Sequence, residues 1–240
     1  MGMESRKIIA KNIAKMLHDG DFVNLGVGMP TLVSNYIPED MTVLFHAENG
    51  AVGLGTLVPG TEEELRVWEK ENSGEQGGWK TGHKDLCNAS CEYVTLIPGS
   101  SCFDSSLAFV MARGGHLDAT ILGGMQVDAK GSLANWMIPG KHISGMGGAM
   151  DLVCGAKKVI VAMEHCTKTG ESKLLKECTM PLTAVQCVDT VVTEYCILEW
   201  SEDHFVVTAI APYITKEELI AKTEFELVFA DEVAVMDIQI

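Results

Sequence analysis

Two short apolar runs separated by a glycine-rich turn place the strongest constraint on the fold. Residues 22–25 read FVNL and are followed by GVGMPT, in which Pro30 suits the first turn of a helix running through Tyr36. The second run, residues 42–45, ends shortly before Glu48. Strand, glycine turn, helix and strand in this order are typical of the opening of a parallel α/β sheet.

Similar patterns predict further elements along the 240 residues. Ser5 is expected to cap a first helix that ends at Asp19-Gly20, and Thr215 with Glu218 forms a capping box for a late helix. Another helix is expected after Asp104. Apolar runs predict strands at 93–97, 120–122, 159–163, 188–192, 196–200 and 205–209. No repeat or linker separates two domains, so we expect a single domain over 1–240 with a polar surface insertion at about 60–90.

Composition excludes several classes of protein. The net charge of −15 is unsuited to a nucleic-acid surface, which needs clustered Lys and Arg. No segment has the length of a membrane span, and the N-terminus lacks a signal-peptide core. The eight cysteines contain no C-x-x-C pair, a pattern that favours reduced thiols in a cytoplasmic protein.

Glu48 has three local interpretations. It can be a turn carboxylate, which local context favours, because Asn49-Gly50 follows it directly. It can hold a ribose, because it lies twenty residues beyond Gly28 of the G-x-G turn, although Thr31 occupies the place of the third glycine of a dinucleotide fingerprint. It can also be a nucleophile, since a carboxylate is ionised at neutral pH and needs only a dry site to carry an acyl group.

The stretch GKHISGMGGAMDLV, residues 140–153, is a second candidate. Its glycines precede an apolar helical segment and could turn several N–H groups toward a phosphate or an oxyanion, although a helix entry without a ligand would look similar.

Metal and thiol chemistry are weakly indicated, and no metal site is expected. His83, Cys87 and Cys91 are spaced to share a helical face, but no fourth ligand is evident. Adjacent residues on an extended chain point apart, so His165 and Cys166 are not expected to pair as base and nucleophile.

The motifs NLGVGMP, FHAENG, LGGMQVD, LANWMIPGK and GMGGAMDLVCGAKKVIVAMEH occur in one order. In this the chain resembles the B (β) subunit of family I CoA-transferases, which include succinyl-CoA:3-oxoacid and butyrate–acetoacetate CoA-transferases. The resemblance implies an open, mostly parallel twisted sheet with helices on both faces, as in ribose-phosphate isomerases. It also implies a hetero-oligomer whose active site forms where the B subunit meets an A subunit.

The resemblance assigns roles to particular residues. Glu48 matches the catalytic glutamate, and Gly148 matches a backbone oxyanion donor. Ala47 replaces the usual serine, and Ala51 replaces a larger aliphatic residue. These two departures from the family pattern leave the acyl-group preference open. The residues expected to contact coenzyme A are Gly26, Gly28, Asn49, Gly147 and Ala149.

The implied reaction is a ping-pong exchange. Glu48 attacks an acyl-CoA thioester to give an acyl-glutamyl anhydride, the released thiolate forms a glutamyl-CoA thioester, and an acceptor acid reverses the steps. Coenzyme A is then a co-substrate and no cofactor is permanently bound; the substrates are short-chain and 3-oxo acids. Lys141, Lys157 or Lys158 could meet CoA phosphates. The alternatives are an NAD(P)-dependent oxidoreductase and a phosphosugar isomerase in which Glu48 is a base.

Overall fold

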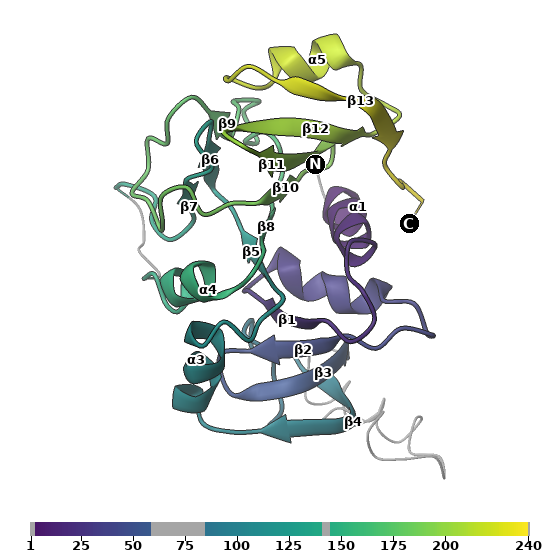
Figure 1. Cartoon of the computed structure of the whole chain (residues 1–240), viewed down its shortest axis with the longest axis vertical. Coiled ribbons are helices and arrows are strands. Elements are labelled where there is room, and N and C mark those ends of the chain that lie inside the picture. Colours follow the sequence, from purple (N-terminus) through teal and green to yellow (C-terminus); the bar gives the residue numbers. More distant parts are fainter. Residues whose placement is uncertain (1–2, 59–84, 141–144, 240) are drawn as a thin grey trace.

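A computed structural model describes residues 3–58, 85–140 and 145–239. Most strands in these ranges join one sheet, in the order β13-β12-β11-β10-β8-β5-β1-β2-β3-β4 (Figure 1). The strands are β1 Phe22–Leu25, β2 Leu44–Ala47, β3 Ala51–Leu57, β4 Val94–Cys102, β5 Ala119–Gly123, β8 Val159–Ala162, β10 Thr190–Val192, β11 Cys196–Ser201, β12 His204–Ile210 and β13 Val228–Val235. A smaller sheet contains β7 Leu133–Ala134, β6 Gln126–Asp128 and β9 Leu174–Leu175.

The centre of the large sheet is parallel. Strands β10, β8, β5, β1 and β2 all run in one direction, whereas β11 and β3 pair antiparallel with the two ends of this block. The chain starts in the middle at β1, moves to β2 on one side, and later fills the other side with β5, β8 and β10. An α/β fold with a mostly parallel sheet is therefore confirmed.

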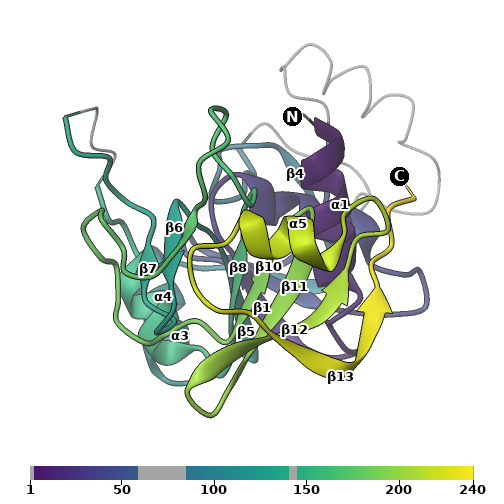
Figure 2. The ribbon, with the colours of Figure 1, turned by 90° about the horizontal axis from the view of Figure 1, so that it is seen from above.

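Helices cover both faces of the sheet. The helix α1 (Met3–Ala14) and the 3₁₀-helix η1 (Met29–Tyr36) lie on one face, and α3 (Ser105–Arg113) and α4 (Ala149–Gly155) lie on the other (Figures 1 and 2). The late helix α5 (Lys216–Ala221) buries Leu219 in the cluster that also contains α4 side chains. Each face thus has its own hydrophobic core.

Local signals placed several elements correctly. Asp104 caps α3 by accepting the Leu107 N–H at 3.0 Å, and Thr215 forms the predicted capping box with Glu218. The first helix differs, because it begins at Met3 and Ser5 lies inside it, so the predicted cap is wrong. The segment after Gly28 is helical as expected but 3₁₀ rather than α.

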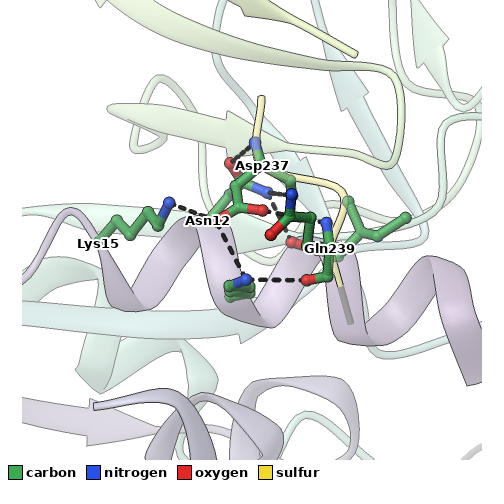
Figure 3. A network of polar contacts seen from close by, with 6 residues as sticks. Asn12, Lys15, Asp237 and Gln239 are labelled. Carbon is green, nitrogen blue, oxygen red and sulfur yellow. Dashed lines mark hydrogen bonds and ion pairs between the residues drawn. The ribbon is translucent and has the colours of Figure 1, made fainter. Parts of the chain in front are cut away.

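Polar contacts join the C-terminal tail to α1 (Figure 3). The buried Asn12 donates to the carbonyls of Ile8 and Asp237, both at 2.8 Å, and accepts the Asp237 N–H at 3.1 Å. Lys11 and Lys15 both pair with the Asp237 carboxylate. The last described residues therefore hold the first helix against the sheet. Among the described residues, no helix is long and apolar enough to span a membrane.

Candidate active site

The candidate residues gather at the edge of the sheet where the parallel strands end. Gly26 follows β1 and donates its N–H to the Ile121 carbonyl of β5 at 2.8 Å, and Glu48 follows β2. The chain adds β2 on one side of β1 and β5 on the other side. This edge therefore contains the topological switch point, where open α/β sheets bind ligands. The element order thus brings together the glycine turn and Glu48, which were predicted separately.

Glu48 occupies the turn between β2 and β3. The Gly50 N–H donates to the Ala47 carbonyl at 3.0 Å, which reverses the chain directly around Glu48. The side chain is half-buried, and its Oε2 atom is buried without a hydrogen-bond partner among the described residues. Burial raises the pKa of the Glu48 carboxyl above its ordinary value, and a hydrogen bond from its own backbone opposes part of this shift. The Oε2 atom is therefore poorly solvated and unpaired within the described residues, which suits a nucleophile better than a turn-stabilising group.

Gly148 lies beside Glu48, although a hundred residues separate them in the sequence. A Cβ atom on Gly148 would be 3.7 Å from the Glu48 Cγ and 2.5 Å from ring atoms of Phe109 in α3. Gly148 is the N-cap of α4, and within the described part of the chain its N–H has no hydrogen-bond partner. The absence of a side chain here lets the backbone lie beside the Glu48 side chain.

The neighbouring residues of the 140–153 motif contribute differently. Gly147 has a left-handed φ of +55° and admits the turn into α4. The Ala149 N–H donates to the Met146 carbonyl at 3.3 Å, so this amide is already used within the turn. Lys141 lies outside the described residues.

Residues 87–92 form a loop that we call the cysteine loop. This loop forms hydrogen bonds with both Gly28 and Asn49. The Ser90 hydroxyl accepts the Gly28 N–H at 2.7 Å, and Asn49 Nδ2 donates to the Cys87 carbonyl at 2.9 Å. The Gly28 amide is thus occupied, and Pro30 has no N–H, so the turn offers fewer donors than a dinucleotide fingerprint requires. No sequence pattern indicates this role for the loop, because its contacts join residues far apart in the chain.

A buried polar row crosses the sheet close to the strand end that precedes Glu48. His46 Nδ1 lies 2.9 Å from Asn24 Oδ1, and Asn24 Nδ2 donates to Thr120 Oγ1 at 3.2 Å, which links β2, β1 and β5. Burial lowers the pKa of His46 to about 4, so its imidazole is neutral at pH 7. His46 and Glu48 are two residues apart along the strand and turn, on the side that faces α3 and α4.

The structure also locates residues that do not approach Glu48. Ala47 and Ala51 belong to the core with α1 and η1, on the opposite face of the sheet, so these departures change the core packing beside Glu48. Lys157 and Lys158 precede β8 and lie at the opposite edge of the sheet, where Lys157 pairs with Asp118 at 2.8 Å.

Metal ligands do not gather in the described residues, where no group of three or more candidate side chains is found. Cys87 and Cys91 belong to a hairpin and not to a helix, so the predicted shared helical face is wrong. His83 and most of the 60–90 insertion lie outside the described residues. His165 and Cys166 are both buried, and the imidazole bonds Thr193 and Thr223, with the Cys196 Sγ at 3.9 Å, and not the Cys166 thiol.

Comparison with known proteins shows the family of this chain. A family model described as "Coenzyme A transferase" matches residues 6–68 and 80–222. The chain belongs to the coenzyme A transferase family. It is 45% identical over 236 residues to the beta subunit of the acetate CoA-transferase of Haemophilus influenzae, covering 98% of this chain and 97% of that protein.

Two further comparisons agree with this assignment. The B subunit of the succinyl-CoA:3-ketoacid coenzyme A transferase of Helicobacter pylori is 45% identical over 221 residues, 92% of this chain and 97% of its own. The crystal structure of an acyl-CoA transferase apoenzyme from Escherichia coli O157:H7 superposes with a TM-score of 0.71 and 19% identity, covering 99% of this chain and 44% of that chain. At that identity, the superposition establishes the fold alone.

Proposed function

We propose that this chain moves coenzyme A between a short-chain acyl-CoA and a carboxylic or 3-oxo acid, with Glu48 as the covalent carrier. The observation that carries the proposal is the half-buried Glu48 carboxylate beside the Gly148 backbone, whose Oε2 atom is buried without a hydrogen-bond partner among the described residues. A carboxylate oxygen that is already shielded from solvent loses little solvation when it attacks a carbonyl carbon. Membership in the coenzyme A transferase family supports this chemistry over the dinucleotide and isomerase alternatives.

The steps follow from the atoms at the site. A Glu48 oxygen adds to the thioester carbonyl, and the C–S bond breaks to release CoA thiolate and leave an acyl-glutamyl anhydride. The thiolate then adds to the glutamyl carbonyl, which forms the glutamyl-CoA thioester and frees the first carboxylate. The acceptor acid runs the same steps in reverse. Each addition places negative charge on an oxygen, and the Gly148 N–H is our candidate to hold it; losing such a donor typically costs roughly 10²–10³ in rate.

The relatives suggest a partner subunit and a range of substrates for this chain. Proteins similar to this chain are named as beta or B subunits, so we propose that an A subunit completes and dries the site. The names of these relatives give acetate, and succinyl-CoA with a 3-ketoacid, as substrates, and we take the proposed acyl range from them. Coenzyme A enters as a co-substrate at the edge formed by the turns at Gly26, Gly28 and Asn49.

The decisive experiment traps the thioester. The chain is combined with its A subunit, incubated with acetyl-CoA and digested, and the fragment containing residue 48 is analysed by mass spectrometry. We expect a CoA adduct on Glu48, none on Glu164, which is a half-buried glutamate at the end of β8, and none in Glu48→Gln. The variant should also lose transfer activity by roughly 10⁴-fold or more, as other enzymes do when a nucleophile is removed. An adduct that persists in Glu48→Gln would overturn the proposal.

A further inference from the structure

The cysteine loop contacts the candidate active site at two points. Its Ser90 hydroxyl accepts the Gly28 N–H at 2.7 Å, and its Cys87 contacts Asn49, the residue directly after Glu48. Asn49 Nδ2 lies 2.9 Å from the Cys87 carbonyl oxygen and 3.9 Å from the Cys87 Sγ. A change at the Cys87 sulfur therefore reaches the turn that holds Glu48 through a single side chain.

The loop also brings two thiols together. Cys87 forms an antiparallel bridge with Tyr93, and the Cys91 N–H donates to the Asn88 carbonyl at 3.0 Å, which folds residue 91 back toward residue 87. Cys91 is exposed and Cys87 is half-buried. Burial raises the pKa of the Cys87 thiol, and the neighbouring Cys91 thiol raises this pKa further through its charge and a side-chain hydrogen bond.

The loop conformation is fixed by many polar contacts. Cys91 has a φ of +59°, a left-handed value uncommon for a residue with a side chain. Asn88 Oδ1 accepts the N–H groups of Ser90 and Glu92 at 2.8 and 3.1 Å, and Thr31 donates to the Glu92 carboxylate at 2.8 Å. These hydrogen bonds therefore fix the backbone of the loop that carries the two cysteines.

We propose that Cys87 and Cys91 form a reversible dithiol–disulfide pair, oxidised by a hydroperoxide, that regulates the adjacent site. The exposed Cys91 sulfur attacks the peroxide O–O bond and becomes a sulfenic acid, and the peroxide leaves as water or an alcohol. The Cys87 sulfur then attacks the sulfenic sulfur, which forms the S–S bond and releases water. Two thiols and one hydroperoxide thus give one disulfide, one alcohol or water, and one further water. A dithiol reductant reverses the change.

The disulfide alters the support of Asn49. Bonding to Cys91 redirects the Cys87 sulfur away from Asn49 Nδ2, which keeps only carbonyl partners in the loop. Because small displacements of catalytic groups have large effects on rate, we expect the oxidised enzyme to transfer CoA roughly 3- to 10-fold more slowly. This activity effect rests on the proposed function, whereas formation of the disulfide does not.

The test treats the complex of this chain and its A subunit with hydrogen peroxide. We expect the fragment containing Cys87 and Cys91 to lose two hydrogens and resist alkylation, the transfer rate to fall, and dithiothreitol to restore both. Cys91→Ser should keep the basal rate, form no disulfide and lose the reversible inhibition. The matched control is Cys102→Ser, which removes another exposed thiol, on β4, and should behave as the unmodified chain.

Two results would overturn the inference. Complete alkylation of both thiols after peroxide treatment would show that they do not pair. A disulfide that leaves the transfer rate unchanged would show that the loop does not control the site. A chain that forms the disulfide but never transfers CoA would contradict the proposed function, while the thiol pairing would stand on the mass measurement.

Discussion

At residue 48, the fold keeps a carboxylate where ionisation is unfavourable. Burial raises the pKa of Glu48, so the folded chain holds this proton more tightly than the unfolded chain does. The resulting stabilisation is present below the unfolded pKa of about 4.3 and is lost as the pH rises through the folded value. At neutral pH the ionised Glu48 therefore opposes folding.

Replacing this carboxylate by a neutral amide should stabilise the fold. We expect Glu48→Gln to increase the free energy of unfolding at pH 7 and to lose this advantage near pH 4, where Glu48 itself is protonated. Denaturant titrations of both proteins at the two pH values measure the difference. Glu226→Gln, at an exposed glutamate, should change little in the same assay. A less stable Glu48→Gln at pH 7 would contradict the role assigned to burial.

A neighbouring aromatic ring leaves no room for a side chain at Gly148. In Gly148→Ala, the new methyl group would lie 2.5 Å from Phe109, so we expect a loss of about 1–3 kcal/mol in unfolding free energy and a lower transfer rate. Adding Phe109→Leu removes ring atoms at the clash and should restore part of the stability. Equal stabilities of the single and double variants, compared by thermal unfolding, would show that the ring is not the obstacle.

At the scale of elements, the turn between β2 and β3 depends on Gly50. This residue has a φ of +123°, and a Cβ atom would lie 2.2 Å from the Phe103 carbonyl oxygen. Gly20 also has a positive φ, of +85°, but no atom lies within 4 Å of its Cβ position. Gly20→Ala therefore tests backbone strain alone, which costs about 1–2 kcal/mol. We expect Gly50→Ala to be clearly more destabilising and to lower activity; equal thermal shifts would contradict this.

The elements that could be predicted from sequence are those with local signals. Strand β1 is apolar and bounded by glycine, and α3 and α5 carry their own caps, so neighbours in the chain specify them. Strand β3 was missed because Gly53 and Gly55 interrupt its pattern. Its glycines fit against Ser100 and Thr95 of β4, a partner supplied from beyond a long insertion. Strand β13 was missed because Asp231 and Glu232 interrupt its apolar run and because it lies at the edge of the sheet.

The candidate site likewise has one part that local sequence signals predict and another part that depends on tertiary contacts. Glu48 stands out locally, because an acid ends an apolar strand immediately before a turn. Its approach to Gly148 and the contact between Asn49 and Cys87 are tertiary, and no spacing rule reports them. Motif resemblance supplied the first pairing. It did not supply the second, since the cysteine loop lies outside the motifs that carry the resemblance.

At the scale of the whole molecule, two buried histidines make the stability of the fold depend on pH. His46 and His165 lie near the carboxyl ends of β2 and β8, and burial is the main cause that lowers the pKa of each to about 4. Both imidazoles are neutral at pH 7 and bond neighbours on adjacent segments. Because these groups are buried, protonating either one would place a charge inside the sheet layer, so they favour folding above pH 6.5 and lose that contribution as the pH falls toward 4.

The contact between the C-terminal tail and α1 has a different pH signature (Figure 3). Hydrogen bonds from Lys15 and Lys11 depress the pKa of Asp237, so its contribution is present above the unfolded value of about 3.9 and is lost as the pH falls below it. We expect Asp237→Asn to lower the melting temperature at pH 7 and the gap to the unmodified chain to close below about pH 4. Asp203→Asn is the matched control, because its carboxylate is 91% exposed and contacts only His204 at 3.0 Å among ion-pair partners in the described residues. A gap that stays constant from pH 7 to pH 3 would mean that the tail is held by Asn12 and the backbone and not by the charge of Asp237.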